Sequence, residues 1–158
     1  MRKLLWILLL AHGLSASAGE LHPFTAQSLA DIKGRFSGRP FMLTLWSLTC
    51  THCAKELQLL GKLARTDKAM PLVIVSTDSP DDGKDIQAAL LRFGLAHLDT
   101  WVFADAVPER LRQRIDPAWH GELPRSYLFD STHRAEAHSG VLEEKKLKQW
   151  FAQSQPSR

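Results

Sequence analysis

The sequence contains very little cysteine. Only two of its 158 residues are cysteines, Cys50 and Cys53. A structural zinc site usually has four ligands, with a second cysteine pair or a histidine pair at a fixed spacing, and the chain has no such set. A disulfide that closes so small a loop constrains the unfolded chain by only about 2 kcal/mol. These absences leave reversible redox chemistry as the main interpretation of the pair.

The chain also has no apolar run long enough to cross a membrane comfortably. The run Leu4–Leu10 is much shorter than the roughly 20 residues that a transmembrane helix needs. It follows the basic pair Arg2 and Lys3 and precedes the small residues Ala16-Ser17-Ala18. This order predicts a secretory signal peptide over residues 1–18, cut after Ala18. An uncut membrane anchor is the alternative.

A strong excess of charge of one sign is missing too. The formal net charge is +3, from 20 basic and 17 acidic residues, and removal of Arg2 and Lys3 leaves 18 against 17. Without clustered Lys and Arg, the sequence gives no reason to expect a nucleic-acid partner. Export would place the cysteines in an oxidising compartment. We therefore expect a periplasmic or secreted protein, or one anchored in the membrane and facing the periplasm if the signal is uncut.

The remaining residues, 19–158, have an ordinary globular composition, with 44% apolar and 23% charged residues in the whole chain. We expect one domain, in which apolar runs with strand character alternate with amphipathic helices. The expected strands are 41–48, 72–75, 100–103, 126–129 and 135–139, and the expected helices are 28–36, 50–65, 86–93, 108–115 and 142–153. Residues 19–25 are expected to be an extended lead-in. This alternation predicts an α/β fold with a largely parallel sheet and an antiparallel edge.

The two cysteines lie where the apolar strand 41–48 meets the amphipathic helix 50–65. A helix N-terminus has free N–H groups and a partial positive charge, and both favour a thiolate over a thiol. The location is therefore suited to reversible dithiol chemistry.

These residues carry a resemblance to a known family. Trp46 stands four positions before the first cysteine, the Cys-x-x-Cys pair opens a helix, and Leu123-Pro124 precedes a late strand, which resembles the thioredoxin fold. The extra strand and helix at 72–93, the signal peptide and Glu56 resemble the TlpA/ResA-type extracytoplasmic thiol-disulfide oxidoreductases. Over residues 28–151, the resemblance implies an α/β, thioredoxin-like three-layer fold with a central mixed β-sheet and an inserted βα unit.

The resemblance implies an exported thiol-disulfide oxidoreductase whose Cys50–Cys53 pair cycles between dithiol and disulfide, most often as a reductase. Cys50 would be the exposed nucleophile and Cys53 the buried resolving thiol, as expected from exchange chemistry. The partners would be protein thiols or disulfides and an upstream electron-donor protein. The resemblance implies no cofactor and no metal, and it implies membrane contact only if the signal segment is uncut.

Three further residues have roles that the resemblance implies. Pro124 would be a cis-proline against the dithiol, and Leu123 and Pro124 would offer backbone to a partner strand; an ordinary proline at the start of a strand is the alternative. Glu56 would be a buried acid that moves protons at the dithiol; a solvated carboxylate on the helix surface is the alternative. Thr44 stands where thioredoxin has a buried aspartate, so Glu56 is the only acid close by in sequence.

The residues around the cysteines are expected to tune the pair, namely Trp46, Thr51 and His52. His52 stands where reductases commonly have proline, and an imidazole beside a thiolate favours the reduced form, which makes the disulfide more oxidising. His52 therefore supports a second hypothesis, an oxidase or isomerase of the same fold, although it could be exposed and incidental. Trp119 and His120 could line a partner groove beside Pro124.

A third hypothesis belongs to another class of protein, a module that handles Cu(I). Soft thiolates select Cu(I), and Cys50, Cys53 and a histidine could supply the ligands. The chain lacks the Met- and His-rich stretch that would strengthen this interpretation.

Overall fold

The computed structural model describes residues 19–67 and 70–154. The expected signal peptide, residues 1–18, and its cut after Ala18 lie outside the described residues. Within the described ranges, no helix has both the length and the apolar character that a membrane crossing requires.

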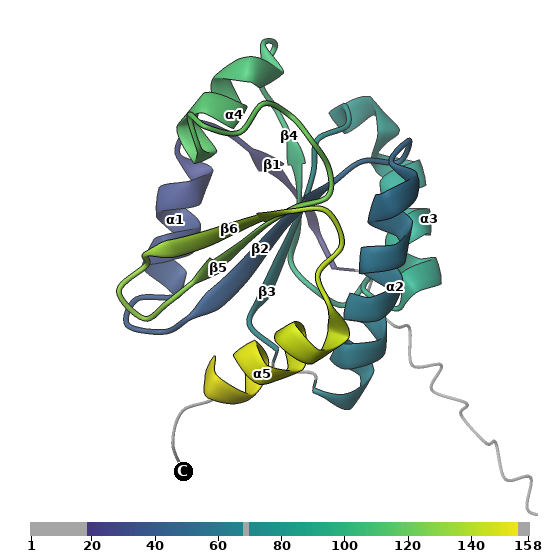
Figure 1. Cartoon of the computed structure of the whole chain (residues 1–158). Helices are drawn as coiled ribbons and strands as arrows, with labels where there is room; N and C mark the ends of the chain where they lie inside the picture. Colours follow the sequence, from purple (N-terminus) through teal and green to yellow (C-terminus); the bar gives the residue numbers. More distant parts are fainter. Residues whose placement is uncertain (1–18, 68–69, 155–158) are drawn as a thin grey trace, which may run out of the picture.

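A six-stranded mixed sheet forms the centre of the molecule, with the strand order β1-β4-β3-β2-β5-β6 (Figure 1). The strands are β1 (Leu21–Phe24), β2 (Phe41–Trp46), β3 (Leu72–Ser76), β4 (Thr100–Phe103), β5 (Arg125–Phe129) and β6 (Ala135–Ser139). The first four pair in parallel, whereas β5 is antiparallel to both β2 and β6. The prediction of a parallel sheet with an antiparallel edge is therefore confirmed.

Helices cover both faces of the sheet, which gives three layers (Figure 1). The helices are α1 (Ser28–Arg35), α2 (Thr51–Thr66), α3 (Gly83–Phe93), α4 (Pro108–Ile115) and α5 (Glu144–Ser154), with a short 3-10 turn at Pro80–Asp82. Side chains of α2, α3 and α5 join one apolar core, and side chains of α1 and α4 join a second core on the opposite face. The predicted three-layer arrangement is confirmed.

Strand β2 separates these two cores, and all six of its residues are buried. Met42 and Trp46 belong to the core under α2, whereas Leu43 and Leu45 belong to the core under α1. Burial on both faces explains why this segment is an almost continuous apolar run in the sequence.

The predicted extended lead-in is a strand of the sheet. β1 pairs in parallel with β4, with Leu21 opposite Thr100 and Phe24 opposite Phe103. An edge strand has a hydrogen-bonded neighbour on one side only, so it tolerates Pro23, which has no N–H. Its place in the sheet was not predicted, because the strand is short and its partner residues are 79 positions away, which leaves no local signal.

The inserted βα unit expected at 72–93 corresponds to β3 and α3. β3 lies between β2 and β4, and α3 packs beside α2. The two helices approach closely at Gly61, where a methyl group would overlap the backbone carbonyl oxygen of Phe93. Glycine at this position therefore allows the α2–α3 contact.

We predict opposite effects for the same change at two helical glycines. Gly61→Ala should lower the free energy of unfolding by about 2 kcal/mol, because the added methyl group must displace backbone. Gly34→Ala, in α1, should raise it by about 0.5 kcal/mol, because a methyl group there meets nothing within 4 Å and alanine is the better helix former. Urea unfolding of the oxidised protein measures both free energies. Equal changes in Gly61→Ala and Gly34→Ala would contradict the close α2–α3 contact at Gly61.

Candidate redox site

Cys50 and Cys53 form a disulfide, with a Cα–Cα distance of 5.2 Å. Cys50 is the N-cap residue of α2, and its sulfur accepts a hydrogen bond from the Cys53 N–H at 3.1 Å. The Cys50 side chain is half-buried, whereas Cys53 is 0% exposed. Cys50 is therefore the more exposed cysteine of the pair.

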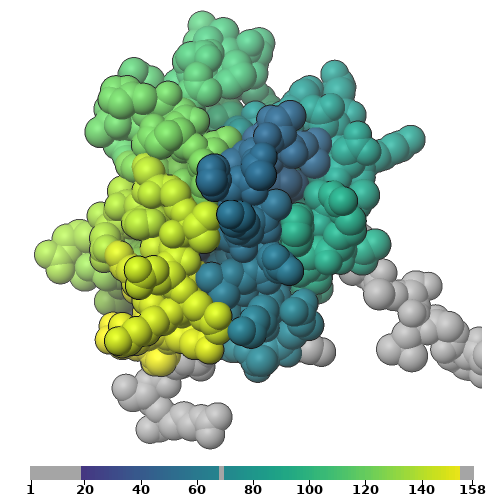
Figure 2. All heavy atoms as spheres, turned by 45° about the vertical axis from the view of Figure 1, so that its right-hand side comes forward, coloured from purple at the N-terminus to yellow at the C-terminus, as the bar shows by residue number. Residues whose placement is uncertain are grey.

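Helix α2 presents its first turn at the surface. Figure 2 shows α2 in the middle of one face, between α3 and the C-terminal segment. Thr51 and His52 lie in this first turn, and both side chains are exposed. The N–H groups of a first turn have no partner within the helix, and they favour negative charge at the N-cap sulfur when the pair is reduced.

The carboxylate of Asp78 holds the loop that leads to Cys50. It accepts hydrogen bonds from the Ser47 hydroxyl at 2.8 Å and from the Leu48 N–H at 2.9 Å. The Ser76 hydroxyl donates to the same carboxylate at 2.6 Å. No role for Asp78 was predicted from the sequence. The neighbouring carboxyl ends of the parallel strands β2 and β3 could have suggested it.

Trp46 lies in the core directly before this loop. Its indole N–H is the only buried side-chain polar atom that lacks a hydrogen-bond partner in the described part of the chain. Trp46 and Cys50 line a small pocket of about 70 Å³, together with Leu57, Arg92 and Phe93 among others. Cys50 therefore lies beside a small pocket that residues of α2 and α3 line.

Glu56 is buried, at 1% exposure, so the alternative of a solvated carboxylate is wrong. One carboxylate oxygen accepts hydrogen bonds from the hydroxyls of Thr44 at 2.9 Å and Ser126 at 2.7 Å. The other accepts the backbone N–H of Leu142 at 3.1 Å. All three donors are neutral, so hydrogen bonds rather than an ion pair compensate the burial of this acid. Glu56 lies three residues after Cys53, and both residues are on the inner side of α2.

The peptide bond between Leu123 and Pro124 is cis. Arg125 pairs with Leu45 in the antiparallel ladder, so Pro124 lies at the level of Trp46, at the end of β2 from which the chain continues to Cys50. The fold therefore brings this segment to the edge of the sheet that carries the dithiol, although about 70 residues separate them in sequence.

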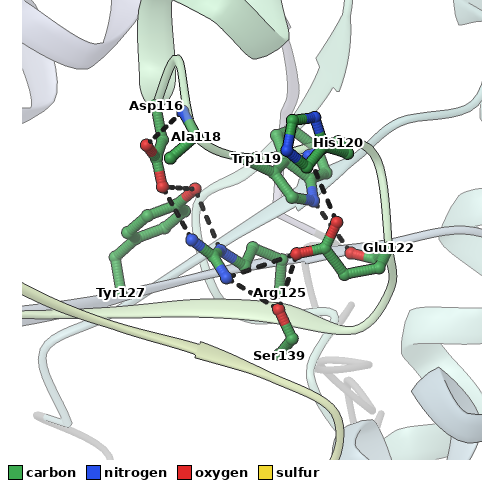
Figure 3. A network of polar contacts seen from close by, with 8 residues as sticks. All are labelled: Asp116, Ala118, Trp119, His120, Glu122, Arg125, Tyr127 and Ser139. Carbon is green, nitrogen blue, oxygen red and sulfur yellow. Dashed lines mark hydrogen bonds and ion pairs between the residues drawn. The ribbon is translucent and has the colours of Figure 1, made fainter.

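A polar cluster surrounds Arg125, the residue after Pro124 (Figure 3). Its guanidinium group donates to Asp116 at 2.7 Å, to Ser139 at 2.7 Å and to the Tyr127 hydroxyl at 3.2 Å. Glu122 accepts from the Ser139 hydroxyl at 2.7 Å and from Arg125 at 3.4 Å. No part of this cluster was predicted from the sequence.

The cluster changes the pKa values of its members. Burial raises the pKa of Asp116, but hydrogen bonds from the Ala118 N–H, Arg125 and Tyr127 lower it by more, so that it lies below its usual range. The hydrogen bond from Ser139 is the main cause of the lowered pKa of Glu122. Burial raises the pKa of Tyr127 to about 12. At neutral pH, two carboxylates therefore face one guanidinium group and a neutral phenol.

Trp119 was expected to line a partner groove, and this prediction is wrong. It is 4% exposed and lies in the core under α4, where its indole N–H donates to the Glu122 carbonyl at 2.9 Å. His120 is exposed. Among the residues that the structure describes, no group of three His, Cys, Asp or Glu side chains could hold a metal ion.

No protein-family model and no curated protein sequence matches the chain. Solved structures do. One is a secreted Mycobacterium tuberculosis disulfide oxidoreductase homologous to Escherichia coli DsbE, with 19% identity, a TM-score of 0.61, and coverage of 76% of this chain and 85% of that one.

Two other structures agree with it. A thiol:disulfide interchange protein of the thioredoxin family from Chlorobium tepidum has 12% identity and a TM-score of 0.61, covering 77% of this chain and 83% of that one. StoA from Bacillus subtilis has 18% identity and a TM-score of 0.55, covering 72% and 83%. At these identities the similarity establishes the fold, which is thioredoxin-like.

We predict that the Arg125 cluster makes the protein sensitive to acid. The folded-state pKa values of Asp116 and Glu122 lie below the ordinary 3.8 and 4.5. Their contribution to the free energy of unfolding is complete above about pH 5 and is lost as the pH falls through the lowered values. Asp116→Asn should therefore be less stable than the wild type at pH 7, and this difference should shrink below about pH 4.

Thermal unfolding of the oxidised protein between pH 7 and pH 2.5 measures this difference. Asp31→Asn, at an exposed position on α1, is the control and should follow the wild-type profile. A difference between Asp116→Asn and the wild type that stays constant with pH would contradict the assignment.

Proposed function

We propose that the protein is an exported thiol-disulfide oxidoreductase that exchanges its Cys50–Cys53 pair with the cysteines of partner proteins and acts as a reductase. One observation carries the proposal: a half-buried N-cap cysteine is joined to a fully buried cysteine one turn along the same helix. The proteins of similar fold whose descriptions name disulfide oxidoreduction or thiol:disulfide interchange support it.

Exchange takes two steps. In the reduced protein, the Cys50 thiolate attacks one sulfur of a partner disulfide, which forms a mixed disulfide and releases a partner thiolate. The Cys53 thiol then loses its proton, and its sulfur attacks Cys50. This step forms the Cys50–Cys53 disulfide and releases the second partner thiolate. Two electrons pass to the partner, and an upstream donor protein returns two electrons to the pair.

Burial creates a need for a proton acceptor near Cys53, because water does not reach this thiol. Glu56 is the acid on the inner side of α2, three residues further on, and its carboxylate is fixed by Thr44, Ser126 and the Leu142 N–H. We assign it the role of accepting and returning this proton.

Export is the second part of the proposal. It rests on the signal-like order of residues 1–18 in the sequence, and the secreted relative in fold supports it. A periplasmic or secreted location would supply partner proteins that contain disulfides. An uncut signal would anchor the same domain to the membrane.

Replacing each cysteine in turn tests the chemistry. Cys50→Ser should abolish disulfide exchange with a protein substrate such as insulin, because it removes the only accessible sulfur of the pair. Cys53→Ser should keep the first step and accumulate a mixed disulfide, because nothing resolves it. Exchange assays and non-reducing mass spectrometry measure the two results, with circular dichroism to verify folding. Full exchange activity in Cys50→Ser would refute the proposal.

An oxidase or isomerase is the second candidate, favoured by the exposed His52 in the first turn of α2. Equilibration with glutathione separates the candidates: a reduction potential near about −270 mV is expected for a reductase and one near about −120 mV for an oxidase. If His52 stabilises the Cys50 thiolate, His52→Ala should shift the potential by about 30 mV to more negative values. His97→Ala, at another exposed position, is the control, and an unchanged potential in His52→Ala would remove the argument for an oxidase.

A further inference from the structure

The backbone of Leu123 is free to bind. Neither its N–H nor its C=O has a hydrogen-bond partner among residues 19–67 and 70–154. The next carbonyl group, that of Pro124, is already occupied by the Gly140 N–H at 2.9 Å. Leu123 therefore has one free donor and one free acceptor, close to the end of β2 that leads to Cys50. An extended partner segment that binds as an added strand needs such a donor and acceptor.

The residues on either side of this dipeptide are held firmly. Before it, the Glu122 carbonyl accepts the Trp119 indole N–H at 2.9 Å, and the Glu122 carboxylate accepts the His120 N–H at 3.2 Å. After it, Arg125 is a member of β5, and its side chain is only 12% exposed. The free backbone of Leu123 thus lies between Glu122 and Arg125, whose backbone or side chains are held by hydrogen bonds.

The Arg125 side chain connects the segment around Leu123 to the rest of the molecule. Figure 3 shows its guanidinium group between Asp116 and Tyr127 on one side and Glu122 and Ser139 on the other. These partners belong to the end of α4, to β5 itself, to the loop before β5 and to β6. A single side chain therefore ties together the segments that enter and leave the Leu123-Pro124 turn.

We infer that Arg125 is a positioning residue for protein substrates: it holds the Leu123 backbone in the conformation that pairs with a partner segment next to Cys50. The inference rests on the proposed exchange function and adds a determinant of substrate class to it. A small disulfide needs only the Cys50 sulfur, whereas a protein disulfide also needs the backbone of Leu123. Loss of the Arg125 contacts therefore affects protein disulfides selectively.

The planar fork of arginine matters as well as its charge. Arg125 donates in three directions at once, to Asp116, Ser139 and Tyr127. A lysine ammonium group is a compact point charge on a flexible stem and cannot reproduce this geometry. Arg125→Lys keeps the charge and removes the fork, so it separates positioning from simple electrostatic attraction of a partner.

The experiment compares two substrates of the pre-reduced, full-length protein. One is insulin, and the other is 2-hydroxyethyl disulfide, which is small and uncharged. Reactions are quenched with acid, free thiols are alkylated, and the rate is followed against substrate concentration. For Arg125→Met and Arg125→Lys, we expect the insulin concentration at half-maximal rate to rise about fivefold to tenfold, as for the loss of one backbone hydrogen bond to the partner. The maximal rate with insulin and the rate constant with the small disulfide should stay within about twofold of the wild type.

Two further variants support the comparison. Ser139→Ala removes only the hydroxyl that joins Arg125 to Glu122, so it should fold and should give a smaller rise in the same direction. Arg134→Gln removes an exposed ion pair with Asp130 in the same β5–β6 hairpin and should behave as the wild type.

Wild-type kinetics in Arg125→Lys, or an equal loss with both substrates, would overturn the inference. Failure of the wild type to react with either disulfide would instead refute the proposed function, so the two failures are distinguishable.

Discussion

Strand β2 is buried on both faces and has a strand on each side, and the site depends on this central position. Its ladder with β3 brings Asp78 to the loop before Cys50, and its ladder with β5 brings Pro124 to the level of Trp46. A shift of β2 by one residue would turn Thr44 away from Glu56 and Ser126 and towards the opposite apolar core, so the hydrogen bonds of Thr44 specify the register. The first turn of α2 is thereby held at a defined place between the two neighbouring strands.

Two carboxylates contact α2 or the loop before it, and neither forms an ion pair within residues 19–67 and 70–154. Asp78 fixes the loop before the helix, and Glu56 ties the inner side of the helix to β2, β5 and the segment before α5. Both accept hydrogen bonds from neutral donors, which compensate the burial of Glu56 and the partial burial of Asp78. Among the described residues, no arginine or lysine contacts Glu56, and this fits the role proposed for it above.

The segment that we propose to bind the partner is built differently. Around Leu123 and Pro124, a guanidinium group, two carboxylates and a phenol form a charged cluster, in which Arg125 and Asp116 are largely shielded from solvent and Glu122 is exposed. The energy of such a cluster depends strongly on geometry, because each member is costly to leave without its partner. Extended protein segments form backbone hydrogen bonds whatever their side chains are, so the role proposed for Leu123 fits partners of varied sequence.

The sequence by itself determined the dithiol, its place between a buried strand and an amphipathic helix, and most of the strands and helices, because hydrophobic periodicity and helix-start signals are local. It could also single out Glu56 and Pro124 through the family resemblance, but not whether Glu56 is buried. Only the tertiary structure decided the contacts of Glu56, whose partners are 12, 70 and 86 positions away in the sequence. The same holds for the hydrogen bonds of Asp78 in the loop before Cys50, for the place of β1 at the sheet edge and for the Arg125 cluster. Each of these joins polar groups or short strands from distant parts of the chain, and such pairing depends on how the packed elements meet rather than on any pattern along the sequence.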